Sequence, residues 1–133
     1  MSGRAFFDTN VLLYILSGDT TKADRAEEVL AGGGVVSVQV LNEFAAICIR
    51  KLGMSWPEVN ESLDVIRALC SVEPLTAETH DRGRALAARH GFSVYDAMIV
   101  AAALIAGADI LYSEDLQDGM RVDASVTVRN PFR

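Results

Sequence analysis

Several carboxylates in this chain stand where a strand or a helix begins or ends. Asp8 interrupts the apolar stretch AFFDTNVLLYIL, residues 5–16, and Thr9 and Asn10 follow it. Carboxylates hold cations and move protons, but Asp or Asn at such a break also caps the next helix by accepting a hydrogen bond from a free backbone N–H. Asp8 by itself therefore fits a structural role and a chemical role equally well.

Two more carboxylates lie inside predicted helices. Glu43 belongs to the segment 39–52, where an exposed helix face with i, i+4 partners is sufficient to explain it. Asp96 follows Ser93 at the S-x-x-D spacing of a capping box, which is again a sufficient structural explanation. Because a capping carboxylate can also bind a metal ion, Asp96 remains a candidate ligand.

A fourth acidic group, SEDLQD at residues 113–118, directly follows an apolar run. Its simplest explanation is a polar loop in which Ser113 caps a short turn. The spacing does not distinguish which of its three carboxylates, Glu114, Asp115 or Asp118, would do chemistry.

The elements that must position these groups alternate along the whole chain, without a Pro/Gly/Ser-rich linker or an internal repeat. The β-like runs are Arg4 to Phe7, Gly34 to Ser37, Val72 to Leu75, Asp109 to Tyr112 and Ser125 to Arg129. The first four are mostly apolar, which is typical of parallel strands covered by helices on both faces. This alternation predicts one α/β domain over residues 1–133.

Capping residues and glycines delimit the predicted helices. They cover residues 11–16, Thr21 to Gly32, 39–52, a segment that starts at Ser55, Thr76 to His90, and Ser93 to Gly107. Thr21 and Asp24 have the spacing of a capping box. The last helix is apolar on nearly every side, which predicts that it is deeply buried and makes Asp96 in its first turn conspicuous.

These elements are expected to bring the carboxylates together. Ligands in open parallel sheets bind outside the carboxyl ends of the strands, where Asp8 and the segment 113–118 would lie. Clustered carboxylates raise one another's pKa, so ionising all of them requires a cation. An all-oxygen set suits Mg²⁺ or Mn²⁺, and the lack of matching His or Cys argues against zinc. The two histidines, His80 and His90, are predicted to be solvated.

The composition limits the partners and the compartment. With 12 basic and 18 acidic residues the formal net charge is -6, so an RNA or DNA partner would need local basic patches. Cys48 and Cys70 each lie in an apolar segment, as expected of reduced core thiols. Neither the N-terminal MSGRAFFDTN nor the apolar run 97–108 fits a secretory signal or a membrane span. A soluble, cytoplasmic protein is expected.

The acidic motifs, in their order and context, resemble those of the PIN-domain ribonucleases, and more closely the VapC-like toxins of VapBC-type toxin-antitoxin modules. The matching motifs are D-T-N after the first strand, L-N-E-F in the helix after the second, S-x-x-D-A-M-I-x-A-A-A, and Y-S-E-D-L. The resemblance covers nearly the whole chain. It implies a single PIN-like domain with a central five-stranded parallel sheet, in the order 3-2-1-4-5, and helices on both faces.

The resemblance also implies roles for individual residues. The acidic quartet of the family falls on Asp8, Glu43, Asp96 and Asp115. Thr9 and Asn10 fall on positions that orient the first carboxylate, Ser113 matches a small hydroxyl residue near the metal, and Asp118 is kept as an additional acidic ligand. The implied protein is a Mg²⁺- or Mn²⁺-dependent endoribonuclease and a homodimer, with a small antitoxin that inhibits it by occupying its groove.

The mechanistic hypothesis is hydrolysis of RNA phosphodiester bonds without a covalent nucleophile. Asp8, Asp96 and Asp115 would hold one or two metal ions at the scissile phosphate, and Glu43 would ligate a metal or orient the attacking water. The candidate contacts for RNA or for an antitoxin are Arg50, Lys51, Arg82, Arg84 and Arg89.

Two other kinds of protein fit part of this pattern. Receiver domains and haloacid-dehalogenase-like phosphatases also gather carboxylates at strand ends, but they usually need a lysine after a later strand. The lysines here are Lys22 and Lys51, and Asn10 stands where the phosphatase motif needs a second Asp. The stronger alternative is a PIN-like binding subunit with little catalysis, which acts through a partner antitoxin complex that reads DNA. The sequence does not decide the RNA target, the antitoxin or the dimer surface.

Overall fold

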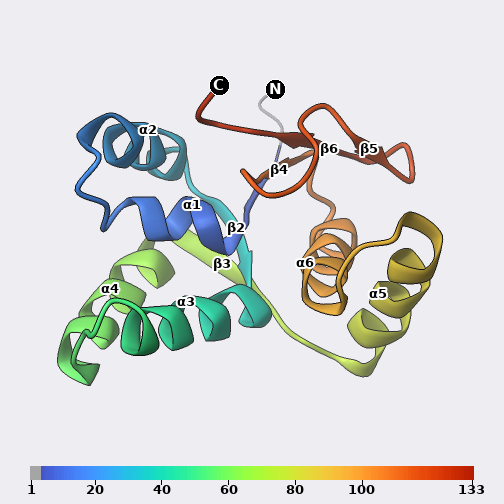
Figure 1. The fold of residues 1–133 in the computed structure, drawn as a ribbon. Coiled ribbons are helices and arrows are strands. Elements are labelled where there is room, and N and C mark those ends of the chain that lie inside the picture. Colours follow the sequence, from blue (N-terminus) through green and yellow to red (C-terminus); the bar gives the residue numbers. More distant parts are fainter. Residues whose placement is uncertain (1–3) are drawn as a thin grey trace.

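The computed structural model describes residues 4–133 and places a mostly parallel sheet between two groups of helices (Figure 1). The strands are β1 (Ala5–Phe7), β2 (Gly34–Ser37), β3 (Cys70–Glu73), β4 (Ile110–Tyr112), β5 (Arg121–Val122) and β6 (Val126–Arg129). The helices are α1 (Thr9–Tyr14), α2 (Thr20–Ala31), α3 (Val38–Arg50), α4 (Trp56–Leu69), α5 (Ala77–His90) and α6 (Val94–Ile105). In Figure 1, α1 to α4 lie on one side of the sheet and α5 and α6 on the other. The prediction about the N-terminal segment falls partly on residues 1–3, which lie outside the described residues.

The strand order is β3-β2-β1-β4-β6-β5, and the first five strands are parallel. The predicted parallel order is therefore confirmed, with β6 in the fifth place. β5 is an additional antiparallel edge strand that the sequence did not predict, because two residues carry no periodicity. In the turn that joins it to β6, Asp123 and Ala124 have positive φ of 50 and 53. That turn lacks the Asn-Gly or Asp-Gly pair that usually identifies such a hairpin.

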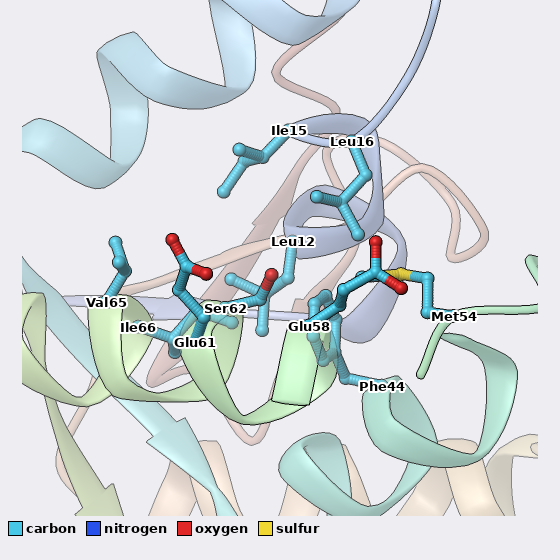
Figure 2. Close-up of a pocket in the computed structure, with 10 residues that line it drawn as sticks. All are labelled: Leu12, Ile15, Leu16, Phe44, Met54, Glu58, Glu61, Ser62, Val65 and Ile66. Carbon is cyan, nitrogen blue, oxygen red and sulfur yellow. The ribbon is translucent and has the colours of Figure 1, made fainter. Parts of the chain in front are cut away.

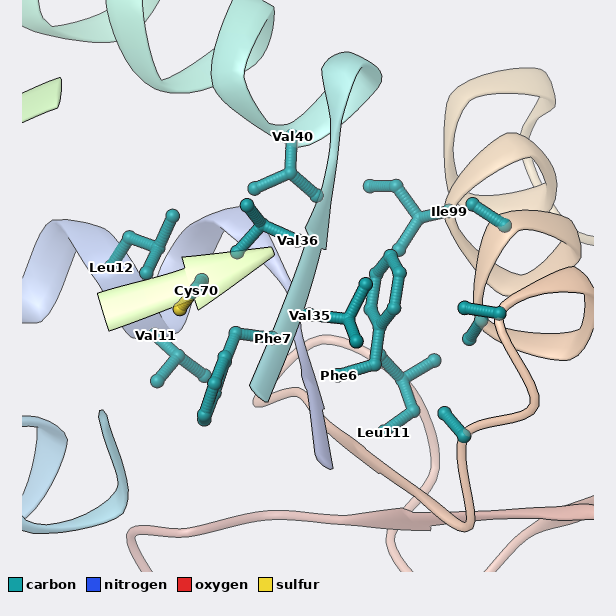
Figure 3. Packing of buried hydrophobic residues seen from close by; sticks show 14 of the residues in the cluster. Phe6, Phe7, Val11, Leu12, Val35, Val36, Val40, Cys70, Ile99 and Leu111 are labelled. Carbon is teal, nitrogen blue, oxygen red and sulfur yellow. The ribbon is translucent and has the colours of Figure 1, made fainter. Parts of the chain in front are cut away.

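The apolar side chains of β1 are buried on both faces of the sheet, because consecutive residues of a strand point to opposite sides. Figure 3 shows Phe6 and Val35 on the side of Ile99 from α6, and Phe7 on the side of Val11 from α1. All five side chains are at most 2% exposed. Packing on both faces explains why the apolar residues of β1 are consecutive rather than alternating with polar ones. It also fixes the position of Asp8, which follows β1.

Some predicted boundaries shift in the structure. β3 begins at Cys70 rather than at Val72. α2 is capped by Asp19, whose Oδ1 accepts a hydrogen bond from the Lys22 N–H at 3.2 Å, so the prediction that Thr21 opens this helix was wrong. Asp caps a helix as well as Thr does. Because Asp19 precedes Thr21 in the chain, α2 begins at Thr20 and includes Thr21.

Cys48 and Cys70 are buried and free, as expected of core thiols. Within residues 4–133 no helix combines the length and the apolar character needed to cross a bilayer.

Candidate active site

Asp8 directly follows β1 and is the N-cap of α1, with a residue exposure of only 3%. Its Oδ1 accepts a hydrogen bond from the Thr9 N–H at 2.7 Å. Its Oδ2 accepts one from the Ser113 hydroxyl at 2.7 Å and one from Asn10 Nδ2 at 3.1 Å. All three donors are neutral, so they orient the carboxylate without neutralising it. Asp8 is thus both a helix cap and a buried, uncompensated charge.

The surroundings of Asp8 resist its ionisation. Burial raises the pKa of Asp8 from its ordinary value of 3.8 to about 6, although the hydrogen bonds from Ser113 and Thr9 oppose the shift. The negative charges of Asp96 and Asp115 raise this pKa further. Both carboxylates therefore lie near enough to Asp8 for their charges to affect its ionisation, as expected from the sheet topology.

Asp96 lies in the first turn of α6, where the Ser93 hydroxyl accepts a hydrogen bond from the Asp96 N–H at 3.1 Å. Among the described residues the reciprocal bond from the Ser93 backbone to the Asp96 carboxylate does not form, so only half of the predicted capping box is present. Burial raises the pKa of Asp96, the Ser93 hydroxyl opposes this, and the charges of Asp115 and Glu43 raise it further. The Asp96 carboxylate therefore belongs electrostatically to the acidic cluster.

Glu43 is half-buried on α3, and both of its carboxylate oxygens are held. The Thr9 hydroxyl donates to Oε1 at 2.9 Å, and Gln39 Nε2 donates to Oε2 at 2.8 Å. The family resemblance implied that the Thr9 hydroxyl orients the first carboxylate, Asp8, whereas in the structure this hydroxyl orients Glu43. This contact fixes Glu43 relative to the end of β1, and it distinguishes Glu43 from a residue on a solvated helix face.

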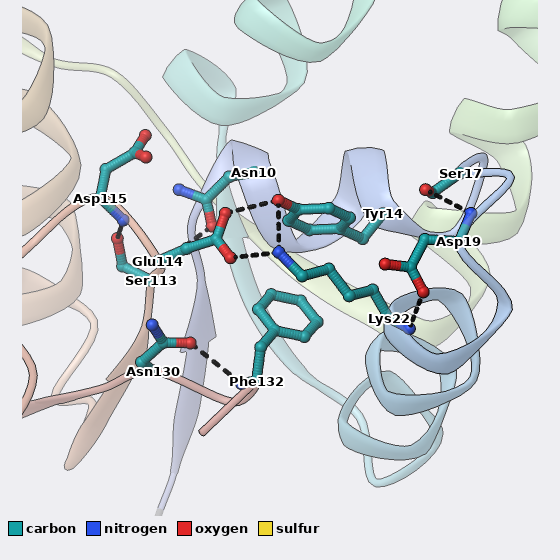
Figure 4. Close-up of polar contacts among 10 residues, drawn as sticks. All are labelled: Asn10, Tyr14, Ser17, Asp19, Lys22, Ser113, Glu114, Asp115, Asn130 and Phe132. Atoms are coloured by element: carbon teal, nitrogen blue, oxygen red, sulfur yellow. Dashed lines mark hydrogen bonds and ion pairs between the residues drawn. The ribbon is translucent and has the colours of Figure 1, made fainter.

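The three carboxylates of segment 113–118 have different surroundings. Lys22 Nζ lies 2.8 Å from Glu114 Oε2, while Asp118 Oδ1 accepts a hydrogen bond from the Asn130 N–H at 2.8 Å. Asp115 forms no ion pair within residues 4–133, and Figure 4 shows its carboxylate pointing away from Glu114. The structure therefore separates one uncommitted carboxylate, Asp115, from two that already have structural partners.

The donor chemistry of the cluster suits a hard divalent cation. Within the described part of the chain, no three Asp, Glu, His or Cys side chains are grouped closely enough to form a ready metal cage. However, the four candidate ligands all provide carboxylate oxygens, and a cation would relieve their mutual repulsion. Both histidines are exposed on α5, as predicted, and they take no part in the cluster.

Two hollows are lined in part by residues of α1. An apolar groove of about 320 Å³ runs between α1, α3 and α4, where Figure 2 shows Leu12 and Ile15 facing Val65 and Ile66. A second hollow of about 430 Å³ reaches the acidic cluster itself. Its lining includes Asn10, Asp115 and, from the end of α3, Lys51 and Leu52.

The predicted basic contacts fall into two sets. On α5, three arginines already face acidic partners: Arg82 lies 3.7 Å from Glu78, Arg84 3.2 Å from Asp81, and Arg89 2.6 Å from Asp123. Arg50 and Lys51 form no ion pair within residues 4–133. Lys51 also lines the hollow beside Asp115, so the end of α3 is the better placed of the two for a phosphate.

Proteins of known structure share this fold. A chain from a toxin-antitoxin complex of Klebsiella pneumoniae matches with a TM-score of 0.72 and 19% identity, over 96% of this chain and 97% of the other. For VapC20 of Mycobacterium tuberculosis, a sarcin-ricin loop cleaving toxin, the TM-score is 0.69 and the identity 19%, over 84% and 89%. VapBC2 of Rickettsia felis, bound to a DNA fragment from its promoter, matches with a TM-score of 0.67 and 16% identity, over 95% of this chain and 97% of the other.

Sequence comparison gives a family assignment. No curated protein matches this chain. The model of the PIN domain, however, matches residues 5–118. This range contains β1 to β4 and all four acidic candidates, Asp8, Glu43, Asp96 and Asp115. The chain therefore belongs to the PIN domain family.

Proposed function

We propose that this protein is a metal-dependent endoribonuclease, the toxin of a type II toxin-antitoxin pair, which hydrolyses RNA phosphodiester bonds. The observation that carries the proposal is the buried carboxylate of Asp8, which has only neutral hydrogen-bond donors and is surrounded by further carboxylates. Membership of the PIN domain family and a shared fold with a sarcin-ricin loop cleaving toxin support RNA as the substrate.

Asp8, Asp96 and Asp115 would hold Mg²⁺ or Mn²⁺, and Glu43 would ligate the metal or orient the attacking water. A bound divalent ion supplies Lewis-acid stabilisation of the scissile phosphate and lowers the pKa of a water molecule. The carboxylates themselves are poor at binding RNA, because they repel its phosphates. Lys51 is the proposed phosphate contact, since it lines the hollow beside Asp115.

The polar neighbours of the carboxylates restrict how they move. Ser113 and Asn10 both donate to Oδ2 of Asp8, which leaves this carboxylate a single orientation. Thr9 and Gln39 likewise hold the two oxygens of Glu43. An oriented, ionised carboxylate can accept a proton from water without first reorganising, which is the requirement for a general base.

We also propose a protein antitoxin as the partner of this chain. The solved relatives from Klebsiella pneumoniae and Rickettsia felis are toxin-antitoxin complexes, which supports this assignment. An amphipathic helix is the element that fits an apolar groove between helices. The groove between α1, α3 and α4 is such a surface, because Leu16 and Val65 in its lining are 38% and 56% exposed. We propose further that the protein is a homodimer and that it is located in the cytoplasm.

The test is cleavage of structured RNAs by the purified protein, with Mg²⁺ or Mn²⁺ and then with a chelator. Asp8→Asn and Asp96→Asn should abolish cleavage, and a chelator should do the same. Asp64→Asn, which changes an exposed carboxylate on α4, is the matched control and should cut like the wild type. Cleavage that survives both site variants or the chelator would contradict the metal-carboxylate mechanism. If the wild type cuts nothing but binds a co-encoded partner and DNA tightly, the protein is a binding subunit instead.

A further inference from the structure

A second polar cluster lies beside the acidic one and consists of Lys22, Tyr14 and Glu114, which we call the lysine clamp. Lys22 Nζ lies 2.8 Å from Glu114 Oε2 and donates to the Tyr14 hydroxyl at 3.0 Å. The Tyr14 hydroxyl in turn donates to Glu114 Oε1 at 2.5 Å. Both oxygens of the Glu114 carboxylate are therefore held, by residues of α2 and α1.

Two aromatic rings restrict the lysine of this clamp. Lys22 Nζ lies 4.5 Å from the ring centroid of Tyr14 and 5.5 Å from that of Phe132, and Figure 4 shows the ammonium group near both rings. The rings pack edge to face, with centroids 4.6 Å apart. These cation–π contacts add to the ion pair, whereas an ordinary surface ion pair has no such additional contacts.

The backbone of Glu114 is tied to the candidate active site. Its N–H donates to Asn10 Oδ1 at 3.0 Å, and Nδ2 of the same Asn10 donates to Asp8 at 3.1 Å. The preceding residue, Ser113, donates to Asp8 and accepts from the Asp115 N–H at 3.2 Å. A displacement of Glu114 would therefore move a neighbour of Asp8 and displace Asp115 together with it.

The charge of the lysine matters as much as its contacts. Without Lys22, Glu114 would be one more unpaired carboxylate next to Asp115 in a region where the pKa of Asp8 is already raised. Like charges on adjacent residues repel each other, and the ion pair with Lys22 offsets this repulsion. The ion pair balances the charge of Glu114, so Glu114 adds no unpaired charge to the acidic cluster. It also anchors the segment 113–115 to α2.

We propose that Lys22 and Tyr14 are positioning residues, which hold Glu114 and thereby keep Ser113 and Asp115 in the arrangement that binds the metal. This inference rests on the proposed metal-dependent nuclease function. Tyr14 also lines the hollow beside Asp115, whereas Lys22 lies outside this lining, so Lys22→Met is the variant that separates positioning from RNA contact.

The experiment compares Lys22→Met, Lys22→Arg and Tyr14→Phe in the full chain. The matched control is Arg25→Met, one turn further along α2, where Arg25 Nε donates to the Pro131 carbonyl at 2.7 Å without contacting Glu114. Three quantities are measured. The first is hydrogen exchange, without metal, of the Asp115 and Leu116 amides, which both donate to the Ser113 hydroxyl at 3.2 Å. The others are Mn²⁺ affinity by calorimetry, and kcat and KM for RNA.

In Lys22→Met the two amides should exchange about 10-fold faster, and Mn²⁺ affinity should fall roughly 10- to 100-fold, as for the loss of partners that orient metal ligands. kcat should fall while KM for RNA stays constant, a split that general destabilisation would not produce. Lys22→Arg should recover most of the affinity, because a guanidinium pairs with a carboxylate and stacks on aromatic rings. Tyr14→Phe should lie between Lys22→Met and the wild type.

The results that would overturn the inference are distinct from those that would overturn the proposed function. Amide exchange in Lys22→Met that is no faster than in Arg25→Met shows that the clamp does not hold the segment. Faster exchange with unchanged Mn²⁺ affinity shows that the held segment does not serve the metal site. Failure of the wild-type protein to bind Mn²⁺ counts instead against the proposed function, whatever the exchange rates of the two amides are.

Discussion

The acidic cluster and the lysine clamp adjoin each other on either side of Asn10, yet they satisfy their charges in opposite ways. In the clamp, burial acts against ionisation, but the hydrogen bonds from Lys22 and Tyr14 outweigh it and lower the pKa of Glu114. In the acidic cluster, burial and neighbouring carboxylates raise the pKa of Asp8 to about 6. The clamp stabilises the fold, whereas the acidic cluster contains electrostatic repulsion that a bound cation would relieve.

The largest expected effect is the loss of cleavage in Asp8→Asn. The amide keeps the size and much of the hydrogen bonding of Asp8 but removes its charge, so RNA cleavage should fall by more than about 100-fold. The reason is that even the partners of metal ligands contribute about 10- to 100-fold. The measurement is the initial rate of cleavage in Mn²⁺. A variant that retains a tenth of the wild-type rate would remove Asp8 from the ligand set.

The neighbouring carboxylates of segment 113–118 provide the sharpest test of the comparison. Asp115→Asn should lose cleavage about 100-fold with little change in stability, because the Asp115 side chain is exposed and forms no ion pair within residues 4–133. Glu114→Gln should lose only about 10-fold in cleavage and should lower the free energy of unfolding by about 1 kcal/mol, because it breaks the clamp. Cleavage assays and urea unfolding measure the two quantities. Equal effects of the two substitutions on both would contradict the separation of these residues.

The pH dependence of stability should also distinguish the two clusters. The pKa of Asp8 is raised in the folded state, so its contribution to stability is fully present below about pH 3.8 and is lost as the pH rises through about 6. Without metal, Asp8→Asn should therefore be more stable than the wild type well above pH 6, by about 3 kcal/mol. The difference should shrink towards pH 4, and Mn²⁺ should reverse it. Urea unfolding at several pH values tests this, and a pH-independent difference would contradict it.

An effect as small as that of Glu114→Gln is expected for Thr9→Val, which removes the hydroxyl that donates to Glu43 at 2.9 Å while preserving the shape of the side chain. Glu43 keeps its bond from Gln39, so cleavage should fall by about 10-fold. The free energy of unfolding should fall by about 1 kcal/mol. If cleavage is unaffected, Glu43 does not need the orientation that Thr9 provides.

Much of the fold could be predicted from local patterns. Continuous apolar runs identified the parallel strands, and the caps Ser93 and Thr76 lie where the sequence placed them. The exceptions are local as well. β5 is too short to show a period, and Asp19 competed with Thr21 for the start of α2. The order of the parallel strands followed from the family resemblance, because strand order depends on contacts that no local pattern describes.

For the site, the sequence identified which positions carry carboxylates at the ends of elements, because capping and strand termination are local properties of the chain. Residue spacing could not distinguish Glu114 from Asp115, and only the family resemblance favoured Asp115, because the difference in their surroundings depends on Lys22, 92 residues away from Glu114. Nor could it place the Thr9 hydroxyl on Glu43, a contact between α1 and α3. The residue types and their order were thus determined by the sequence alone. Only the tertiary structure decided which charges are paired and which remain exposed to one another, since pairing requires elements distant in the chain to meet.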